Sequence, residues 1–443
     1  MNDDSSPILD VDSKPHRKGS TYDVQDPLYH RHLWLDQLRS VIVIFSFIAS
    51  LTWLFSGNIR GGEIPVGPTW LNFGYRYVDF FPRMITLVDI GSQIFMFIMG
   101  LSLSISFQTK AQKKGYKYAW ISVFNRVFVF FWLVEVLLMD FIHFYLNDII
   151  ILGVWVVLTI IIIVLRNTFF KQSDAALYIS LIWSIVSCII WFFKYDIDLW
   201  TVFFNHPLAH FAWATLLGAL GIFTIKRPDI RIIIPGILLG IHYYLWERFR
   251  YWGIQVFVGT HFEFHFMIPF ELMGMGIVGM TATCVWDWIH MDPTDFKVGF
   301  KKRFVPLMVL TCIGHFITDF FQTADSEGVT ASIILLAVAF SSMLAMTMYA
   351  MEYYIKYDIP FLTAIGKNAL FLLLLQAVLV IPYRIVWPGG GGDFRSMVQE
   401  WFNVSTQTHI LVNLMGCIAF LIPIVILIIT GWILDKYKIH IKV

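Results

Sequence analysis

The stretch LVDIGSQIFMFIMGLSLSISF, residues 87–107, is apolar over about the length that a helix needs to cross a bilayer. An acid, Asp89, stands near its start, and small residues such as Gly100 and Ser102 lie on one side of the expected helix. Apolar runs of this length recur along the whole chain. Because backbone groups in lipid must be hydrogen-bonded within their own segment, these runs predict an all-α polytopic membrane bundle.

The composition also indicates a membrane protein whose main partner is the lipid bilayer. Of the 443 residues, 58% are hydrophobic and 14% are charged, whereas a soluble domain carries about 25% charged residues. The candidate spans are 38–56, 85–107, 119–139, 148–165, 176–193, 206–225, 230–246, 266–286, 304–321, 330–350, 361–386 and 410–434. They predict roughly 11–12 transmembrane helices, with short loops between most of them.

Lys and Arg residues are distributed unequally between the two sides that these spans define. Most of the 32 fall on the side that holds both termini. The positive-inside rule therefore predicts cytoplasmic termini in a multi-pass protein of the cell membrane or an endomembrane. Residues 1–33 are polar and rich in proline, so we expect a disordered cytosolic tail and no cleavable signal peptide. The remainder, 34–443, is expected to form a single transmembrane domain.

The segment WLNFGYRYVDFFPRMITLVDIG, residues 70–91, carries charges that a plain membrane anchor does not need. Arg76, Asp79, Arg83 and Asp89 stand at the mouth of the second span. Charges are expensive at such a position, so they indicate a functional site. The alternative is an ordinary solvated loop with an aromatic interfacial belt.

Acids and imidazoles gather at the exoplasmic ends of several other spans. Their pKa values can be tuned near neutrality, so the set suits proton transfer. The residues are Glu135, Asp140, His143, Asp148, His206, His210, His242, His261, Glu263, His265, Glu271, His315 and Asp319. For His206 and His210, a position in the headgroup region is the simpler alternative. Within this set, His315 and Asp319 share a helix face, and a structural pair explains them as well as a functional one.

No metal site is expected. The HFEFH stretch at 261–265 would need further zinc ligands, and no spacing in the sequence identifies them. The four cysteines all lie within apolar runs, where they are expected to act as small core residues.

Basic residues crowd the opposite, cytoplasmic side. Lys110, Lys113 and Lys114 lie in the expected loop between the second and third spans, and Arg126 lies a little inside the third span. Such a patch could hold the phosphates of a nucleotide-bearing donor. The positive-inside rule alone explains the lysines more simply. The net charge of +1 and the absence of a long basic block predict no nucleic-acid partner.

Several fragments, taken in order, are similar to one known family. They are LDQLRS at 35–40, the second span, FNRVF at 124–128, ILGV at 151–154 and FLTAIGKNALFLLLLQ at 361–376. Their order and spacing resemble the transmembrane acyltransferases related to heparan-α-glucosaminide N-acetyltransferase. The resemblance covers the first four spans and the eleventh, while the middle third matches by hydropathy only.

The resemblance implies that 34–443 is a transmembrane acyltransferase-like domain. Such an enzyme passes an acyl group from cytoplasmic acyl-CoA, acetyl-CoA in particular, to a hydroxyl or amine of a glycan or lipid on the exoplasmic side. Asp36 and Arg39 match the family's opening pattern, and Asp89 matches its acid before the second span. Small residues, Gly100 and Ser102 early and Gly366 beside Asn368 late, would let helices or a pantetheine arm approach closely. Asn368 and the basic residues Lys110, Lys113, Lys114 and Arg126 are then expected to contact the donor.

The chain departs from the family at its catalytic position. The family's histidine falls on Asp79 here, and no histidine lies between Gly57 and Asp89. Ser40 also replaces a usual glycine, and Gln376 stands where many relatives have histidine. Asp79 is therefore the predicted base with Asp89 beside it, and the alternative bases are His143, His261 and His265. Substrate contacts are predicted for Arg76, Arg83, Glu135, His315 and Asp319.

Two other functions stay open on the sequence. A non-catalytic relative could transport or flip an amphipathic solute through the same outer site, and the missing histidine favours this alternative. A structural subunit of a larger envelope complex is the third. A homodimer is compatible with each of them.

Overall fold

The computed structural model describes residues 33–55, 90–138, 175–195, 207–256, 263–290, 299–321, 329–355, 359–380 and 410–438, with a few isolated positions between 154 and 162. Every element in these ranges is a helix, which confirms the all-α prediction. The elements are α1 (Leu33–Phe55), α2 (Gly91–Lys114), α3 (Tyr116–Leu138), α5 (Ala175–Tyr195), α6 (Pro207–Thr224), α7 (Pro228–Arg231), α8 (Ile233–Val256), α9 (Glu263–His290), η5 (Phe300–Phe304), α11 (Val305–Phe321), α12 (Ala331–Ala350), η6 (Met351–Ile355), α13 (Pro360–Lys367), α14 (Ala369–Val380) and α16 (Ile410–Lys436).

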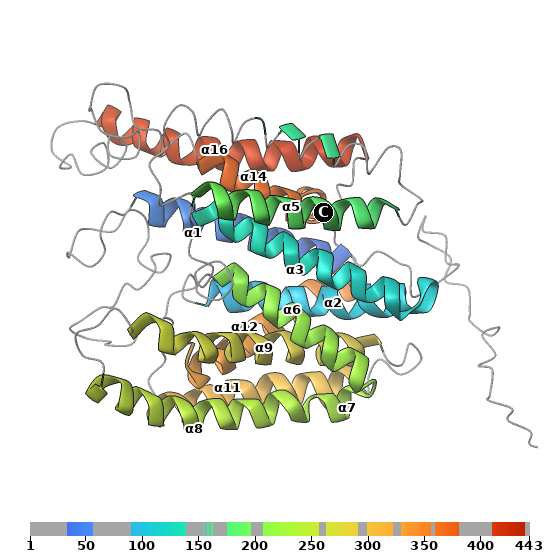
Figure 1. Cartoon of the computed structure of the whole chain (residues 1–443), viewed down its shortest axis with the longest axis vertical. Helices are drawn as coiled ribbons and strands as arrows, with labels where there is room; N and C mark the ends of the chain where they lie inside the picture. The colour runs from blue at the N-terminus through green and yellow to red at the C-terminus, as the bar shows by residue number, and fades with distance from the viewer. Residues whose placement is uncertain are drawn as a thin grey trace, which may run out of the picture. The chain divides into compact units, whose positions relative to one another are not determined.

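The candidate spans coincide with these helices, apart from 148–165, which lies almost wholly outside the described residues. Figure 1 shows the helices side by side. Four described helices are long and apolar enough to cross a membrane, namely 91–114, 270–289, 300–321 and 331–350. These helices support the assignment of the chain to the membrane proteins.

Three local predictions were wrong. The expected loop carrying the lysines is helical, because α2 runs on to Lys114 and only Gly115 separates it from α3. Gly115 has φ 87°, a left-handed value that glycine adopts without steric cost. The expected loop 247–265 is also largely helical, since α8 extends to Val256 and α9 begins at Glu263. The eleventh span is broken at Asn368, between α13 and α14.

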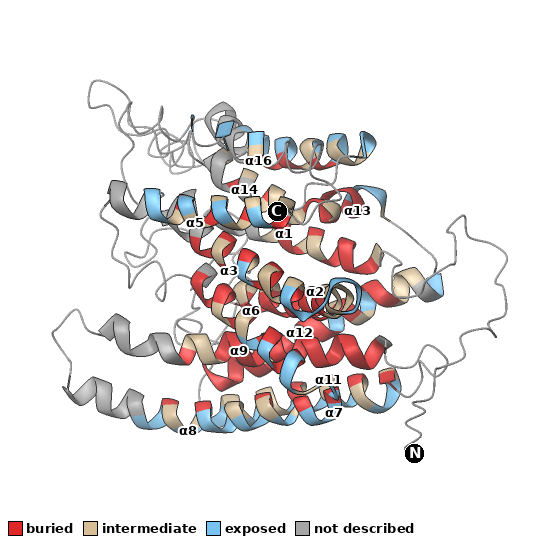
Figure 2. Cartoon of the chain, turned by 45° about the vertical axis from the view of Figure 1, so that its right-hand side comes forward, coloured by how far each residue is buried: buried red, intermediate tan, exposed pale blue. Residues whose placement is uncertain are grey.

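The helix α9 forms the centre of the described bundle. It packs against α2, α6, α8 and α12, and its residues from 274 to 289 are buried (Figure 2). Gly100 of α2 lies directly on this helix, because a Cβ there would overlap the carbonyl oxygen of Gly279. Gly100 therefore serves a close helix crossing, one of the two roles that the sequence left open for it.

The outward sides of the peripheral helices are apolar. On α8, Ile233, Ile237, Ile241 and Tyr244 follow helical spacing and are exposed. On α11, Leu310, Phe316 and Phe320 are exposed in the same way. Exposed apolar faces of this extent suit contact with lipid rather than with water.

Aromatic contacts show which helix ends meet. Trp34, at the start of α1, stacks on Trp286 near the end of α9 and meets Tyr349 at the end of α12. Tyr116, at the start of α3, packs on Phe223 at the end of α6. We call this side of the bundle the Trp34 end. The beginnings of α6 and α12 and the early part of α9 lie at the other side, which we call the His210 end.

Candidate functional site

The structure describes about half of the predicted site residues. Those outside the described residues are Arg76, Asp79, Arg83, Asp89, His143 and His261. Glu135 and His265 lie in α3 and α9, but their side chains fall outside the described part as well. The side chains that can be placed are those of Lys110, Lys113, Lys114, Arg126, His315, Asp319 and Asn368.

The three lysines lie on the last turns of α2, at the Trp34 end. Lys110 donates a hydrogen bond to the hydroxyl of Ser122 on α3. The ammonium of Lys114 lies 4.6 Å from the centre of the Tyr118 ring, and Lys113 is exposed. These contacts fasten the corner between α2 and α3 and leave positive charge on the surface.

Two arginines from different helices meet over one face of α2. Arg39 of α1 donates to Ser102 Oγ from Nε at 3.1 Å and from Nη2 at 2.7 Å. Arg126 of α3 donates from Nη2 to Ser106 Oγ at 3.2 Å. Ser102 and Ser106 are one helical turn apart, and the two guanidinium groups are close enough to interact electrostatically.

The charges in this cluster do not cancel. Asp36 accepts a hydrogen bond from Arg39 Nη1 at 2.9 Å. Across the described ranges, no carboxylate forms an ion pair with Arg126, and its guanidinium donates to a neutral hydroxyl, that of Ser106. Both guanidinium groups are half-buried. Charges inside a membrane bundle are normally paired or bind a ligand. Arg39, Arg126, Ser102 and Ser106 therefore form a candidate anion site, and we call it the Arg39–Arg126 cluster.

Gly366 and Ser40 hold α13 against α1 beside this cluster. A Cβ on Gly366 would overlap the carbonyl oxygen of Asp36. The Ser40 hydroxyl contacts the carbonyl oxygens of Asp36 and Leu362, so this serine joins the two helices. The small residue at 366 thus lets two helices meet, as Gly100 does. Asn368 is buried at the break that follows.

The His210 end holds a second polar cluster. His210 Nε2 lies 3.3 Å from Glu271 Oε2, which joins α6 to α9. The side chains are 3% and 19% exposed, so the pair is largely buried. The sequence placed both residues among the exoplasmic acids and imidazoles, but it did not pair them.

His315 and Asp319 both reach Ser332 at the start of α12. His315 Nδ1 lies 2.9 Å from Ser332 Oγ, and the same hydroxyl lies 3.4 Å from Asp319 Oδ1. Each residue contacts the buried serine, and these contacts fasten α11 to α12. The arrangement fits the structural alternative for this pair better than a substrate contact.

One face of α2 connects the Arg39–Arg126 cluster with the His210 end. Phe95, Met99, Ser102 and Ser106 follow the spacing i, i+4, i+7 and i+11, so they lie along one side of the helix. Phe95 stacks on Phe211 at 5.0 Å, next to His210 in the sequence. Phe95 and Ser102 are roughly 10 Å apart along the helix axis. We call this side the α2 face.

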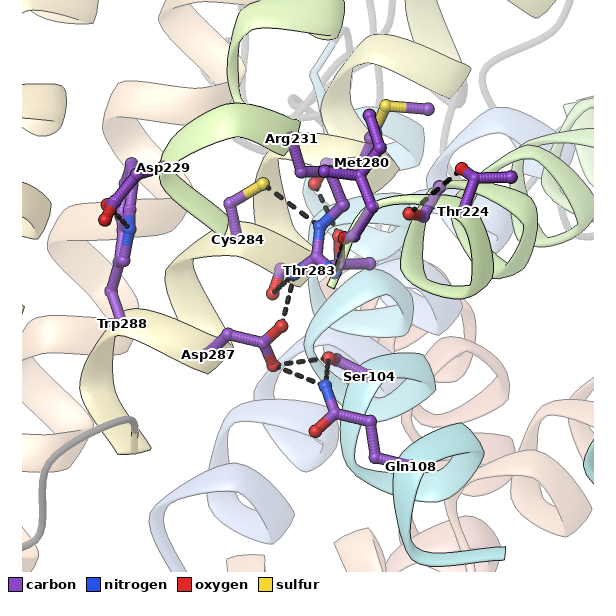
Figure 3. A network of polar contacts seen from close by, with 12 residues as sticks. Ser104, Gln108, Thr224, Asp229, Arg231, Met280, Thr283, Cys284, Asp287 and Trp288 are labelled. Carbon is purple, nitrogen blue, oxygen red and sulfur yellow. Dashed lines mark hydrogen bonds and ion pairs between the residues drawn. The ribbon is translucent and has the colours of Figure 1, made fainter. Parts of the chain in front are cut away.

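On the opposite side of α2, Ser104 and Gln108 bind a carboxylate that pairs with a different arginine. Arg231 is fully buried and forms an ion pair with Asp287 of α9 (Figure 3). Asp287 Oδ1 also accepts from Ser104 Oγ at 2.6 Å and from Gln108 Nε2 at 2.8 Å. We call these four residues the Arg231–Asp287 cluster.

The remaining donors of Arg231 are also used. They point to Cys284 Sγ at 3.4 Å, to the carbonyl oxygen of Thr283 at 3.1 Å and to that of Ile225 at 3.3 Å. A buried polar network that is satisfied in this way fixes helix positions. The alternation of Ser104 and Gln108 with Ser102 and Ser106 in the sequence was a signal for two polar sides on α2.

Comparison with known proteins adds no further assignment. No protein-family model matches the chain, and no curated protein matches it significantly. The resemblance to the transmembrane acyltransferases therefore stays a prediction from the sequence fragments.

Proposed function

We propose that the chain is a multi-pass membrane acyltransferase. It would take an acyl group from acyl-CoA, acetyl-CoA first, on the cytoplasmic side. It would pass the group to a hydroxyl or amine of a glycan or lipid on the exoplasmic side. The Trp34 end would face the cytoplasm with both termini, since exposed Lys113, Lys114, Arg227, Lys301 and Lys302 lie on helix ends there.

The Arg39–Arg126 cluster carries this proposal. Arg39 and Arg126 come from two fragments that resemble the family, and Ser102 comes from a third. These fragments are far apart in the chain, yet their polar side chains converge on the α2 face. Guanidinium groups bind phosphate and carbonyl oxygens in a forked geometry, so they suit an acyl thioester or the phosphates of its carrier.

The α2 face would set the direction in which a bound acyl-CoA donor extends through the bundle. The cluster lies between the basic Trp34 end and the His210 end, where acid and imidazole groups lie. A donor anchored at Arg126, beside Ser106, would need to reach roughly 16 Å along α2 to bring its acyl carbon level with Phe95. The predicted catalytic residues Asp79 and Asp89 precede α2 in the sequence, and α2 begins at the His210 end.

Calorimetry with the purified protein tests the donor site. We expect acetyl-CoA and CoA to bind the wild type, and Arg126→Ala to weaken binding by about 10- to 100-fold, because hydrogen bonds to charged groups contribute about 1.5–3 kcal/mol. Arg126→Lys should lose less, since it keeps the charge without the fork. Arg227→Gln is the control, because Arg227 is exposed at the same end. Absence of CoA binding to the wild type would refute the acyltransferase.

Anion transport is the second candidate, and one observation favours it. An arginine without a carboxylate partner inside a membrane bundle is also typical of a substrate pathway. Proteoliposomes loaded with an amphipathic anion and lacking CoA distinguish the two functions. Uptake or scrambling that Arg126→Ala abolishes, together with no CoA binding, would support the transporter.

A further inference from the structure

The His210–Glu271 contact is a buried imidazole–carboxylate pair between two central helices. His210 Nε2 and Glu271 Oε2 are 3.3 Å apart, and both side chains are shielded by the bundle. In a neutral imidazole, this contact favours a proton on Nε2 that points to Glu271, which leaves the lone pair on Nδ1. A base oriented by a carboxylate is the usual arrangement for proton abstraction from a hydroxyl.

The position of the pair matches the place where an acceptor would meet the donor. Phe211 follows His210 and stacks on Phe95, so the first turns of α6 and α2 lie together. Ser102 and Arg39 lie further along the same α2 face. The pair is therefore at the acceptor end of the path that begins at the Arg39–Arg126 cluster.

The two other histidines whose side chains the structure describes, His242 and His315, have different surroundings. His242 stacks on Trp246 at 6.3 Å and meets the edge of Phe270 at 5.8 Å, so it packs as an aromatic core residue. His315 contacts Ser332 and fastens two helices. Among the histidines whose side chains the structure describes, His210 is the one with a carboxylate within ion-pair distance.

We propose that His210 is the general base for the acceptor and that Glu271 is the positioning residue that orients its ring. This inference rests on the proposed acyltransferase function. His210 would take the role of the imidazole that is missing from residues 57–89. The acceptor would then be a hydroxyl or amine compound, because such a compound must lose a proton when it is acylated.

The step balances with the two substrates alone. The acceptor oxygen or nitrogen attacks the thioester carbonyl carbon, and its proton passes to His210 Nδ1. A new C–O or C–N bond forms as the C–S bond breaks. The CoA thiolate leaves and takes the proton from the imidazolium, so the products are the acylated acceptor and free CoA. Glu271 stabilises the imidazolium through Nε2 while the proton is held.

The test measures CoA release by the purified full chain from acetyl-CoA, with free hexosamines and glycerolipids as acceptor probes. We expect His210→Ala to lower kcat by about 100-fold or more, with KM for acetyl-CoA unchanged. Added imidazole should restore part of the rate in His210→Ala, which a purely structural role would not allow. Glu271→Gln should lower kcat less, and Glu271→Asp should recover part of that loss.

His242→Phe is the matched control, because it replaces another buried histidine of the described bundle by a ring of similar size. It should keep the wild-type rate. If the wild type releases CoA and His210→Ala releases it equally fast, or imidazole gives no rescue, the assignment of His210 is wrong and the acyltransferase stands. If the wild type neither binds CoA nor releases it, the proposed function itself is wrong and the assignment is withdrawn with it.

Discussion

The two arginine clusters on α2 differ in how their charge is compensated. Arg231 is paired with Asp287, and its other donors meet Cys284 and two backbone carbonyl oxygens. On the opposite side of the same helix, Arg126 meets one serine hydroxyl and lies near a second arginine. Both clusters use polar residues of α2 that are one turn apart.

This difference separates a structural role from a binding role. A cluster in which every charge is paired and every hydrogen-bonding group is used cannot also bind a ligand. Removing one of its residues should therefore destabilise the bundle. A cluster with excess positive charge should bind an anion. Removing one of its arginines should therefore change the affinity for that anion more than the stability of the fold. Three substitutions test this distinction, and each is measured by thermal unfolding and folded yield in detergent.

The largest effect is expected for Asp287→Ala. Removing this carboxylate leaves Arg231 buried without its partner, which destabilises a protein by about 3–5 kcal/mol. The variant should lose folded yield and unfold at a much lower temperature than the wild type. Arg303→Gln is the control, because Arg303 pairs with Asp229 near the surface at 2.8 Å and such pairs contribute at most about 1 kcal/mol. Wild-type stability in Asp287→Ala would contradict the structural role of the cluster.

An intermediate effect is expected for Ser104→Ala. Its hydroxyl donates to Asp287 at 2.6 Å, so the substitution removes a hydrogen bond to a buried charge and should cost about 1.5–3 kcal/mol. Ser102→Ala is the matched variant on the opposite side of α2. It should cost less, because Arg39 is 29% exposed and keeps its pairing with Asp36. Equal losses in the two variants would mean that both sides of α2 are structural.

The smallest change in stability is expected for Arg126→Leu. An arginine without a carboxylate partner gains little from burial, so an apolar replacement should shift the free energy of unfolding by less than about 1 kcal/mol or raise it. The same variant should bind acetyl-CoA about 10- to 100-fold more weakly than the wild type in calorimetry. A loss of stability comparable to that of Asp287→Ala would make Arg126 a structural residue and remove the support for the donor site.

The positions of the helices could be predicted from the sequence, because the hydropathy of a segment depends only on the residues of that segment and not on its neighbours in the fold. The predicted spans and the observed helices agree even for α8 and α9, where the ends were placed wrongly. Helix ends depend on local capping and on contacts with neighbours, so apolar runs define them poorly. Lys113 and Lys114 show this, because a charged helical turn extends past the apolar run and Gly115 alone forms the corner.

The polar contacts could be predicted only in part. The fragments that resemble the acyltransferases pointed to Arg39 and Arg126, and the structure brings both to the α2 face. Hydropathy did not show that Arg231, at the start of the span 230–246, is fully buried and paired with a carboxylate. His210 and Glu271 were both noticed, yet nothing in a single sequence says that two polar residues on different helices face each other.

The sequence by itself determined the class of protein, an all-α bundle with helices that suit a membrane, because apolar length is encoded in each segment separately. Only the tertiary structure decided which charges have partners. The contacts that matter join residues 56 and 63 positions apart, as in Arg231 with Asp287 and Arg39 with Ser102. Such pairings depend on helix packing and rotation, which place Ser102 and Ser104 on opposite sides of α2 although one residue separates them.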